Sequence, residues 1–211
     1  MLIAAPLVAT ALSAVAALDS KPLMPPPMPV IVRVSVAAKA SPALITAMLD
    51  EASAIWRPVG VTFAWQMKPS PLPSRLTINV GNSHGTTVDG ALPLGWIRFL
   101  APELPERDIY VSLANARTLL EQYSRLMEAR RLVLMNSENT LLGRALGRAL
   151  AHELGHYLLG SKAHSSAGLM QARRSTTELF AVERLRRFDI DADQRTLIAA
   201  RLELLQSHAL N

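Results

Sequence analysis

Residues 152–156 read His-Glu-Leu-Gly-His and stand near the end of a long helical pattern in this 211-residue chain. Ser137 is suited to cap the start of that helix, and Gly160 is suited to end it. Histidines four residues apart lie on one helix face, about one turn from each other. Their imidazole rings can therefore converge on a single Zn²⁺ ion.

The glutamate inside this segment adds a catalytic function to the expected metal site. Glu153 directly follows the first histidine and would lie beside the open coordination position. There it can take a proton from the attacking water and pass it to the leaving amine, while the metal polarises the scissile carbonyl. We therefore expect a zinc metalloendopeptidase that acts on a peptide or protein substrate. No motif identifies the residues that bind the substrate.

A catalytic zinc site usually has three protein ligands, and His164 is the leading candidate for the third. It lies eight residues after His156, beyond Gly160, where the chain can reverse and bring a loop histidine to the metal. The segment HELGHYLLGSKAH, followed by Gly168-Leu169-Met170, resembles a metzincin motif in which each gap is longer by one residue. The resemblance implies that Met170 lies beneath the metal.

Five short β-branched or alternating segments predict strands. A helix is predicted between the first two, with Ser41 as its N-cap, Pro42 as its first residue, and Pro58 and Gly60 ending it. After residue 113 the pattern is mainly helical. The expected fold is α/β (α+β), with a mixed, twisted, five-stranded sheet packed on helices and a helical C-terminal part. The metzincin resemblance implies that the fourth strand is an antiparallel edge that binds extended peptide. The predicted strands are Val30–Ala37, Val61–Met67, Arg75–Val80, Leu94–Leu100 and Asp108–Leu113.

Two alternatives remain open from the sequence. In gluzincin-type peptidases a later glutamate completes the zinc site, and Glu178 has a suitable position, with Glu183 a less suitable substitute. The second alternative is a secreted binding module that is catalytically silent, although binding alone would not need Glu153. Tyr157 is expected to be a packing residue, and His84 and His208 are expected to be surface residues.

The first residues resemble an export signal. Residues 1–17 are apolar and contain a small-x-small cleavage pattern, residues 18–29 form a proline-rich lead-in, and residues 30–211 are expected to form a single domain. The alternative is an uncleaved membrane anchor. We expect an exported protein with no stable membrane span after removal of the leader, and with no disulfides because the chain has no cysteine.

The net charge of +5 comes from basic residues that are scattered along the chain. They are expected to lie mainly on solvated helix faces. A nucleic-acid surface would show tighter clusters with interleaved aromatic residues, and aromatic residues make up only 5% of this chain, so nucleic-acid binding is not expected. The basic residues concerned include Arg144, Arg148, Arg173, Arg174, Arg184 and Arg187.

Overall fold

The computed structural model describes residues 29–85, 92–129 and 137–207. The predicted signal peptide, most of the proline-rich lead-in and His208 lie outside these ranges. None of the helices within them combines the length and the apolar character that a membrane crossing requires.

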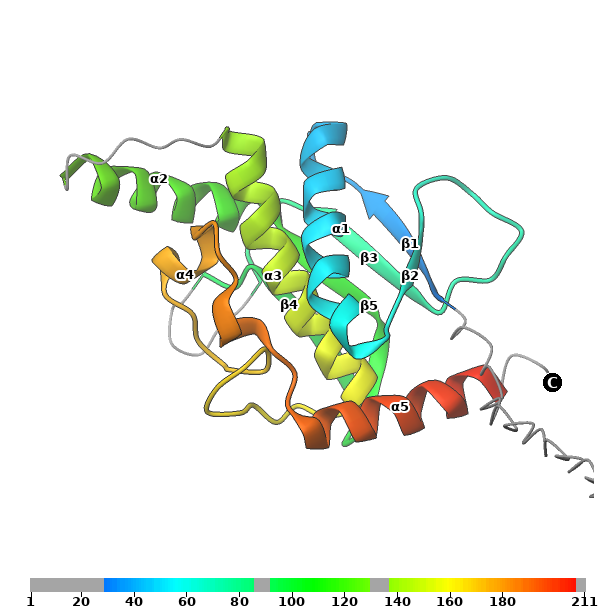
Figure 1. The fold of residues 1–211 in the computed structure, drawn as a ribbon. Coiled ribbons are helices and arrows are strands. Elements are labelled where there is room, and N and C mark those ends of the chain that lie inside the picture. The colour runs from blue at the N-terminus through cyan, green and yellow to red at the C-terminus, as the bar shows by residue number, and fades with distance from the viewer. Residues whose placement is uncertain (1–28, 86–91, 130–136, 208–211) are drawn as a thin grey trace, which may run out of the picture.

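The strands form one mixed five-stranded sheet with the order β2-β1-β3-β5-β4 (Figure 1). Four strands are parallel to their neighbours, whereas β4 pairs antiparallel with β5 at one edge of the sheet. The mixed sheet packed on helices confirms the predicted fold class, and the fourth strand is the expected antiparallel edge. The strands are β1 (Val30–Val36), β2 (Phe63–Gln66), β3 (Leu76–Gly81), β4 (Gly95–Ala101) and β5 (Leu104–Ser112).

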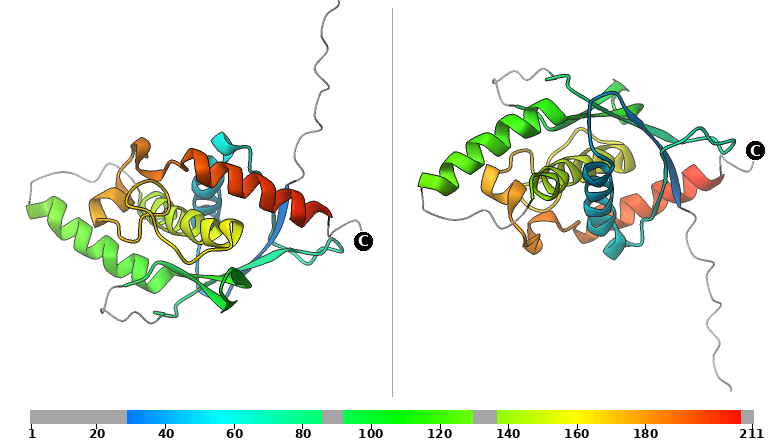
Figure 2. Two further views of the ribbon diagram at one scale, coloured as in Figure 1. Left: turned by 90° about the horizontal axis from the view of Figure 1, so that it is seen from below. Right: turned by 90° about the horizontal axis from the view of Figure 1, so that it is seen from above.

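One face of the sheet is covered by helices α1 (Pro42–Trp56) and α3 (Glu138–Leu159), which lie side by side (Figures 1 and 2). Alternate strand residues such as Val32 and Ile78 are fully buried against them. Ser35, which has the opposite parity to Val32, is exposed. This alternation is typical of a sheet with one buried face.

Helices α1 and α3 approach each other closely because α3 presents two glycines one turn apart. A Cβ atom at Gly143 would lie 2.5 Å from the Cβ of Ala47, and one at Gly147 would lie 2.6 Å from the carbonyl oxygen of Met48. The indole nitrogen of Trp56 also donates to the carbonyl of Ala151, at 3.2 Å. The helix that contains the two motif histidines is thus fixed against α1 along its length.

Both ends of α3 are formed as the sequence predicts. The Ser137 hydroxyl accepts a hydrogen bond from the backbone N–H of Thr140. Gly160 has a φ of 61° and its N–H bonds to the carbonyls of His156 and Tyr157. A left-handed glycine in this position ends the helix and turns the chain back.

The other helices are α2 (Leu113–Ala129), the short α4 (Thr176–Phe180), and α5 (Ala192–Ser207). The observed strand boundaries differ from the predicted ones by one or two residues, except that β5 begins at Leu104 and not at Asp108. A tight turn at Glu103, with φ of 63°, brings Leu104 opposite Ala101. Sequence patterns usually reveal such a hairpin through a glycine, and here a glutamate occupies the left-handed position.

Candidate metal centre

Three histidines from α3 and the following loop converge at one point. One ring nitrogen each from His152, His156 and His164 can be chosen such that all three lie within 4.8 Å of one another. The Nε2 atoms of His152 and His156 are 3.0 Å apart. The structure therefore brings together the three residues that the sequence suggests as ligands.

The other nitrogen of each helical histidine faces a backbone carbonyl. Nδ1 of His152 lies 2.9 Å from the carbonyl oxygen of Leu169, and Nδ1 of His156 lies 2.7 Å from that of Ser161. Because a carbonyl only accepts hydrogen bonds, both Nδ1 atoms are assigned the proton in the neutral rings. In this tautomer two Nε2 lone pairs face each other at 3.0 Å, and a cation between them would remove their repulsion. This arrangement fits Zn²⁺, which binds neutral imidazole in this way.

His164 completes the cluster from an exposed loop. Its ring centroid lies 5.3 Å from that of His152 and 4.9 Å from that of His156. The loop is closed just after it, because the N–H of Ser165 donates to the carbonyl of Met170 at 3.0 Å. His164 is thus accessible to solvent while its backbone is tied to the floor of the site.

Burial keeps the two helical histidines in the neutral form that binds metal. Removal from water lowers the pKa of His152 to about 4, and it also lowers the pKa of His156. Neutral imidazole is the state in which a histidine ligates a metal, so no proton has to be displaced from these rings near neutral pH.

Glu153 lies beside the histidines, under strand β4. Its side chain is buried, and its carboxylate accepts a hydrogen bond from the backbone N–H of Ile97. Burial raises its pKa to about 8, and a divalent cation at the histidines would act in the opposite direction. A Cβ atom on Gly95 would approach the Cγ of Glu153 to 3.0 Å, so the glycine leaves room for this carboxylate.

The free edge of β4 faces the same site. The carbonyl of Leu94 accepts from Ser112 on β5, so the alternation of an antiparallel pair directs the backbone groups of Gly95 and Ile97 away from β5. An open cleft of about 1140 Å³ runs along this edge and contains the three histidines and Glu153 in its walls. An extended chain could bind there by adding a strand to the sheet.

Met170 packs directly against the helix that contains the histidines. It is 1% exposed, and a Cβ atom on Gly155 would overlap its sulfur. Gly155 lies between His152 and His156 in sequence, so the methionine fits under this part of α3 because glycine has no side chain there.

Glu178 is not part of the histidine cluster. Its carboxylate accepts from the backbone N–H and the hydroxyl of Ser175 and forms an ion pair of 2.7 Å with Arg187. These hydrogen bonds and the charge of Arg187 lower the pKa of Glu178. The carboxylate therefore already has partners in the structure, away from the three ring nitrogens.

Tyr157 and His84 lie as the sequence predicts. Tyr157 is 5% exposed and packs in the core, and His84 is an exposed residue whose Nδ1 lies 2.6 Å from Oδ1 of Asn115. The carbonyl of Glu183 lies 3.5 Å from the guanidinium of Arg148. Glu183, like Glu178, lies outside the cluster that the described residues form.

The prediction that the basic residues are solvated is wrong for Arg148. Its side chain is fully buried, pairs with Glu51 at 2.9 Å and donates to the carbonyls of Glu178 and Leu179. The four-residue spacing from Arg148 to His152 could have indicated this, because it places both on the same face of α3. Arg174, which lines the cleft, was also missed and has no comparable signal in the sequence.

The fold resembles those of two solved structures. A zinc-dependent peptidase from Methanocorpusculum labreanum superposes with a TM-score of 0.50 at 13% identity, covering 79% of this chain and 99% of that one. An archaemetzincin from Methanopyrus kandleri superposes with a TM-score of 0.53 at 14% identity, covering 86% and 99%. No family model and no curated protein matches the sequence. At such low identity the likeness establishes a shared fold: this chain has the architecture of those two proteins over nearly their whole length.

Proposed function

We propose that this protein is a zinc-dependent peptidase of the metzincin type, in which His152, His156 and His164 hold the metal and Glu153 is the general base. The observation that supports this most directly is the pair of Nε2 atoms 3.0 Å apart, both with Nδ1 directed at a carbonyl. The two structural neighbours, one named a zinc-dependent peptidase and one an archaemetzincin, are consistent with it.

In this proposal the ion, when bound, supplies a Lewis acid that lowers the pKa of water and polarises the scissile carbonyl. Glu153 accepts the proton of the attacking water and then donates it to the leaving amine. The N–H of Ile97 holds one carboxylate oxygen, which leaves the other oxygen available for proton transfer. Met170 supports the helix beneath the histidines through its contact with Gly155.

The substrate is expected to lie extended along β4. The outward backbone groups of Gly95 and the carbonyl of Ile97 would pair with its main chain, since the N–H of Ile97 already donates to Glu153. The scissile bond would then lie over Glu153 and the histidines, in the cleft that they line. Main-chain pairing explains how an enzyme can hold a peptide without a side-chain motif that the sequence could reveal.

The identity of the third ligand can be tested by zinc binding. His164→Ala removes one of the three clustered nitrogens, so it is expected to lose far more zinc affinity than Glu178→Ala. Affinity is measured by competition with a chromophoric chelator, and the Co²⁺-loaded variants are compared by visible absorption. A ligand change shifts the Co²⁺ bands, and we expect the larger shift in the His164 variant. Loss of metal in the Glu178 variant alone would favour the gluzincin-type site.

The alternative of a catalytically silent binding module is tested by peptide cleavage, because such a module would bind zinc without cleaving a substrate. The leader-free, zinc-loaded chain is incubated with casein and a fluorogenic peptide pool, with and without a chelator. We expect cleavage that the chelator abolishes and added zinc restores. An enzyme that cuts a single partner protein would be missed by the pool, so partner candidates from the same compartment extend the test.

We further propose that the protein is exported, with the leader of residues 1–17 removed. The support is the apolar composition and the cleavage pattern of the leader. Expression with its own N-terminus is expected to yield a mature chain that begins near residue 17 in N-terminal sequencing, whereas an uncleaved anchor would leave Met1 in a membrane fraction.

A further inference from the structure

The backbone carbonyl that orients His152 belongs to a turn held by charged side chains. The carbonyl oxygen of Leu169 lies 2.9 Å from Nδ1 of His152, and the N–H of Leu169 donates to the carbonyl of Asp189 at 2.7 Å. Gly168 adopts a φ of 74°, and a Cβ atom there would lie 2.6 Å from the Asp189 carbonyl oxygen. The position of this turn therefore determines where the hydrogen-bond acceptor of the His152 ring lies.

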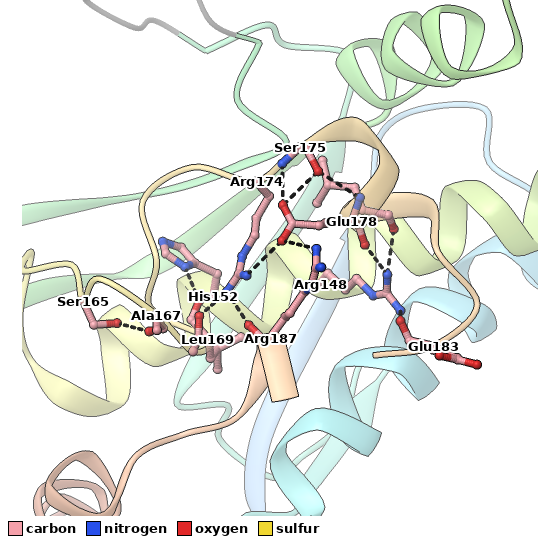
Figure 3. A network of polar contacts seen from close by, with 12 residues as sticks. Arg148, His152, Ser165, Ala167, Leu169, Arg174, Ser175, Glu178, Glu183 and Arg187 are labelled. Atoms are coloured by element: carbon pink, nitrogen blue, oxygen red, sulfur yellow. Dashed lines mark hydrogen bonds and ion pairs between the residues drawn. The ribbon is translucent and has the colours of Figure 1, made fainter. Parts of the chain in front are cut away.

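Arg174 connects this turn to the segment before α5. Its guanidinium donates to the carbonyl of Gly168 and to that of Arg187, the latter at 2.5 Å, and stacks over the ring of Phe188 with 4.6 Å to the centroid. Its side chain is only 10% exposed. Figure 3 shows the guanidinium between the Leu169 turn and Glu178.

Glu178 determines the orientation of Arg174 in turn. One carboxylate oxygen lies 3.9 Å from Arg174 and 2.7 Å from Arg187, and the other accepts two hydrogen bonds from Ser175 at the start of α4. The reciprocal bond from the Glu178 N–H to the Ser175 hydroxyl makes this a capping box. The carboxylate is thus fixed at both oxygens, and it holds two guanidinium groups on one side.

We propose that Arg174, oriented by Glu178, is a positioning residue for the metal site, acting through the Gly168 carbonyl and the Leu169 carbonyl on His152. This inference rests on the proposed zinc function. It also gives Glu178 a role in the site without making it a ligand. Groups that orient a ligating histidine typically change metal affinity by about 10- to 100-fold when removed.

The test compares three arginine variants by zinc affinity, measured by chelator competition, and by unfolding of the metal-free protein. Arg174→Met keeps an apolar stem over Phe188 but removes every donor, so zinc affinity is expected to fall by roughly 10- to 100-fold. Arg174→Lys restores the positive charge and a donor group, without the planar fork of arginine, and is expected to recover part of that loss. Arg195→Met is the matched control, because Arg195 also donates to a nearby carbonyl, that of Ile190 at 2.9 Å, outside the path to His152.

The result differs if Arg174 stabilises the fold without positioning His152. In that case Arg174→Met lowers the stability of the metal-free protein, while the zinc affinity and the Co²⁺ spectrum of the folded fraction match the wild type, and the inference is wrong. If Arg174→Met does not fold, Glu178→Gln decides, because it keeps one acceptor oxygen for Ser175 and loses the charge that orients Arg174. Unchanged zinc affinity in that variant also overturns the inference. A wild-type protein without zinc affinity would instead refute the proposed function.

Discussion

Replacing Glu153 with glutamine is expected to lower kcat by roughly 10²- to 10⁴-fold, the range that a general acid–base group contributes, while zinc remains bound. Glutamine has nearly the same shape and can still accept the hydrogen bond from the N–H of Ile97, so the local structure should persist. It cannot take a proton from water. Peptide hydrolysis and zinc content are measured on the same preparation. Glu153→Ala should likewise lose activity while its zinc content stays unchanged.

The matched control is Glu138→Gln, because Glu138 is an exposed glutamate in the first turn of the same helix. This variant should keep both zinc and full activity. Near-normal hydrolysis by Glu153→Gln would remove Glu153 from the mechanism, since no other carboxylate among the described residues lines the cleft. Loss of zinc together with activity would instead assign the residue a role in holding the metal.

The fold was largely predictable because its local signals agree with its tertiary contacts. Ser41 and Ser137 cap helices where their positions suggest, and the alternation in β1 and β3 matches a sheet buried on one face. The start of β5 was missed because Glu103 supplies a left-handed turn residue that is usually glycine or asparagine. The close contact of α1 and α3 was not predicted either, since Gly143 and Gly147 reveal it only when the partner helix is known.

The histidine side chains of the candidate site could be predicted from the sequence, whereas the backbone groups that orient them could not. The spacing of His152 and His156 follows from helix geometry, and His164 follows from the chain reversal at Gly160. The groups that orient them are the carbonyls of Leu169 and Ser161. Every residue has such a carbonyl, so no sequence pattern can distinguish these two.

Arg148 on α3 is a side chain whose place was not predicted, because arginine usually lies on the surface and this one is buried. Arg148 has no exposed side-chain surface, and burial lowers its pKa, while Glu51 acts in the opposite direction. Its guanidinium stacks over the ring of Phe188. It also donates to the carbonyls of Glu178 and Leu179 in α4 (Figure 3). A buried cation is tolerated only when its donors are satisfied, so Arg148 holds α4 and its flanking residues against α3. Arg144 adds a second link, because it donates to the carbonyl of Phe180 at 2.7 Å.

Arg148→Ala is therefore expected to lower the free energy of unfolding by about 3–5 kcal/mol, measured by denaturant titration of the metal-free protein. The change removes one partner of a buried pair and leaves one oxygen of Glu51 and two backbone carbonyls without their donor. The other oxygen of Glu51 keeps its ion pair with Arg184. Arg184→Met is the matched control. It loses an ion pair to the same carboxylate, at 3.1 Å, but from a side chain that is 43% exposed, so a change below about 1 kcal/mol is expected.

The double variant Glu51→Leu with Arg148→Met separates charge from packing. Replacing both members of a buried ion pair by apolar groups removes the unpaired charge, so the pair of changes should cost less than Arg148→Ala alone. A double variant as unstable as Arg148→Ala would assign the stability to the carbonyls of Glu178 and Leu179 and not to the ion pair. If Arg148→Ala and Arg184→Met lowered the free energy of unfolding equally, burial would not determine how much each arginine contributes to stability. The predicted difference between the two variants would then be wrong.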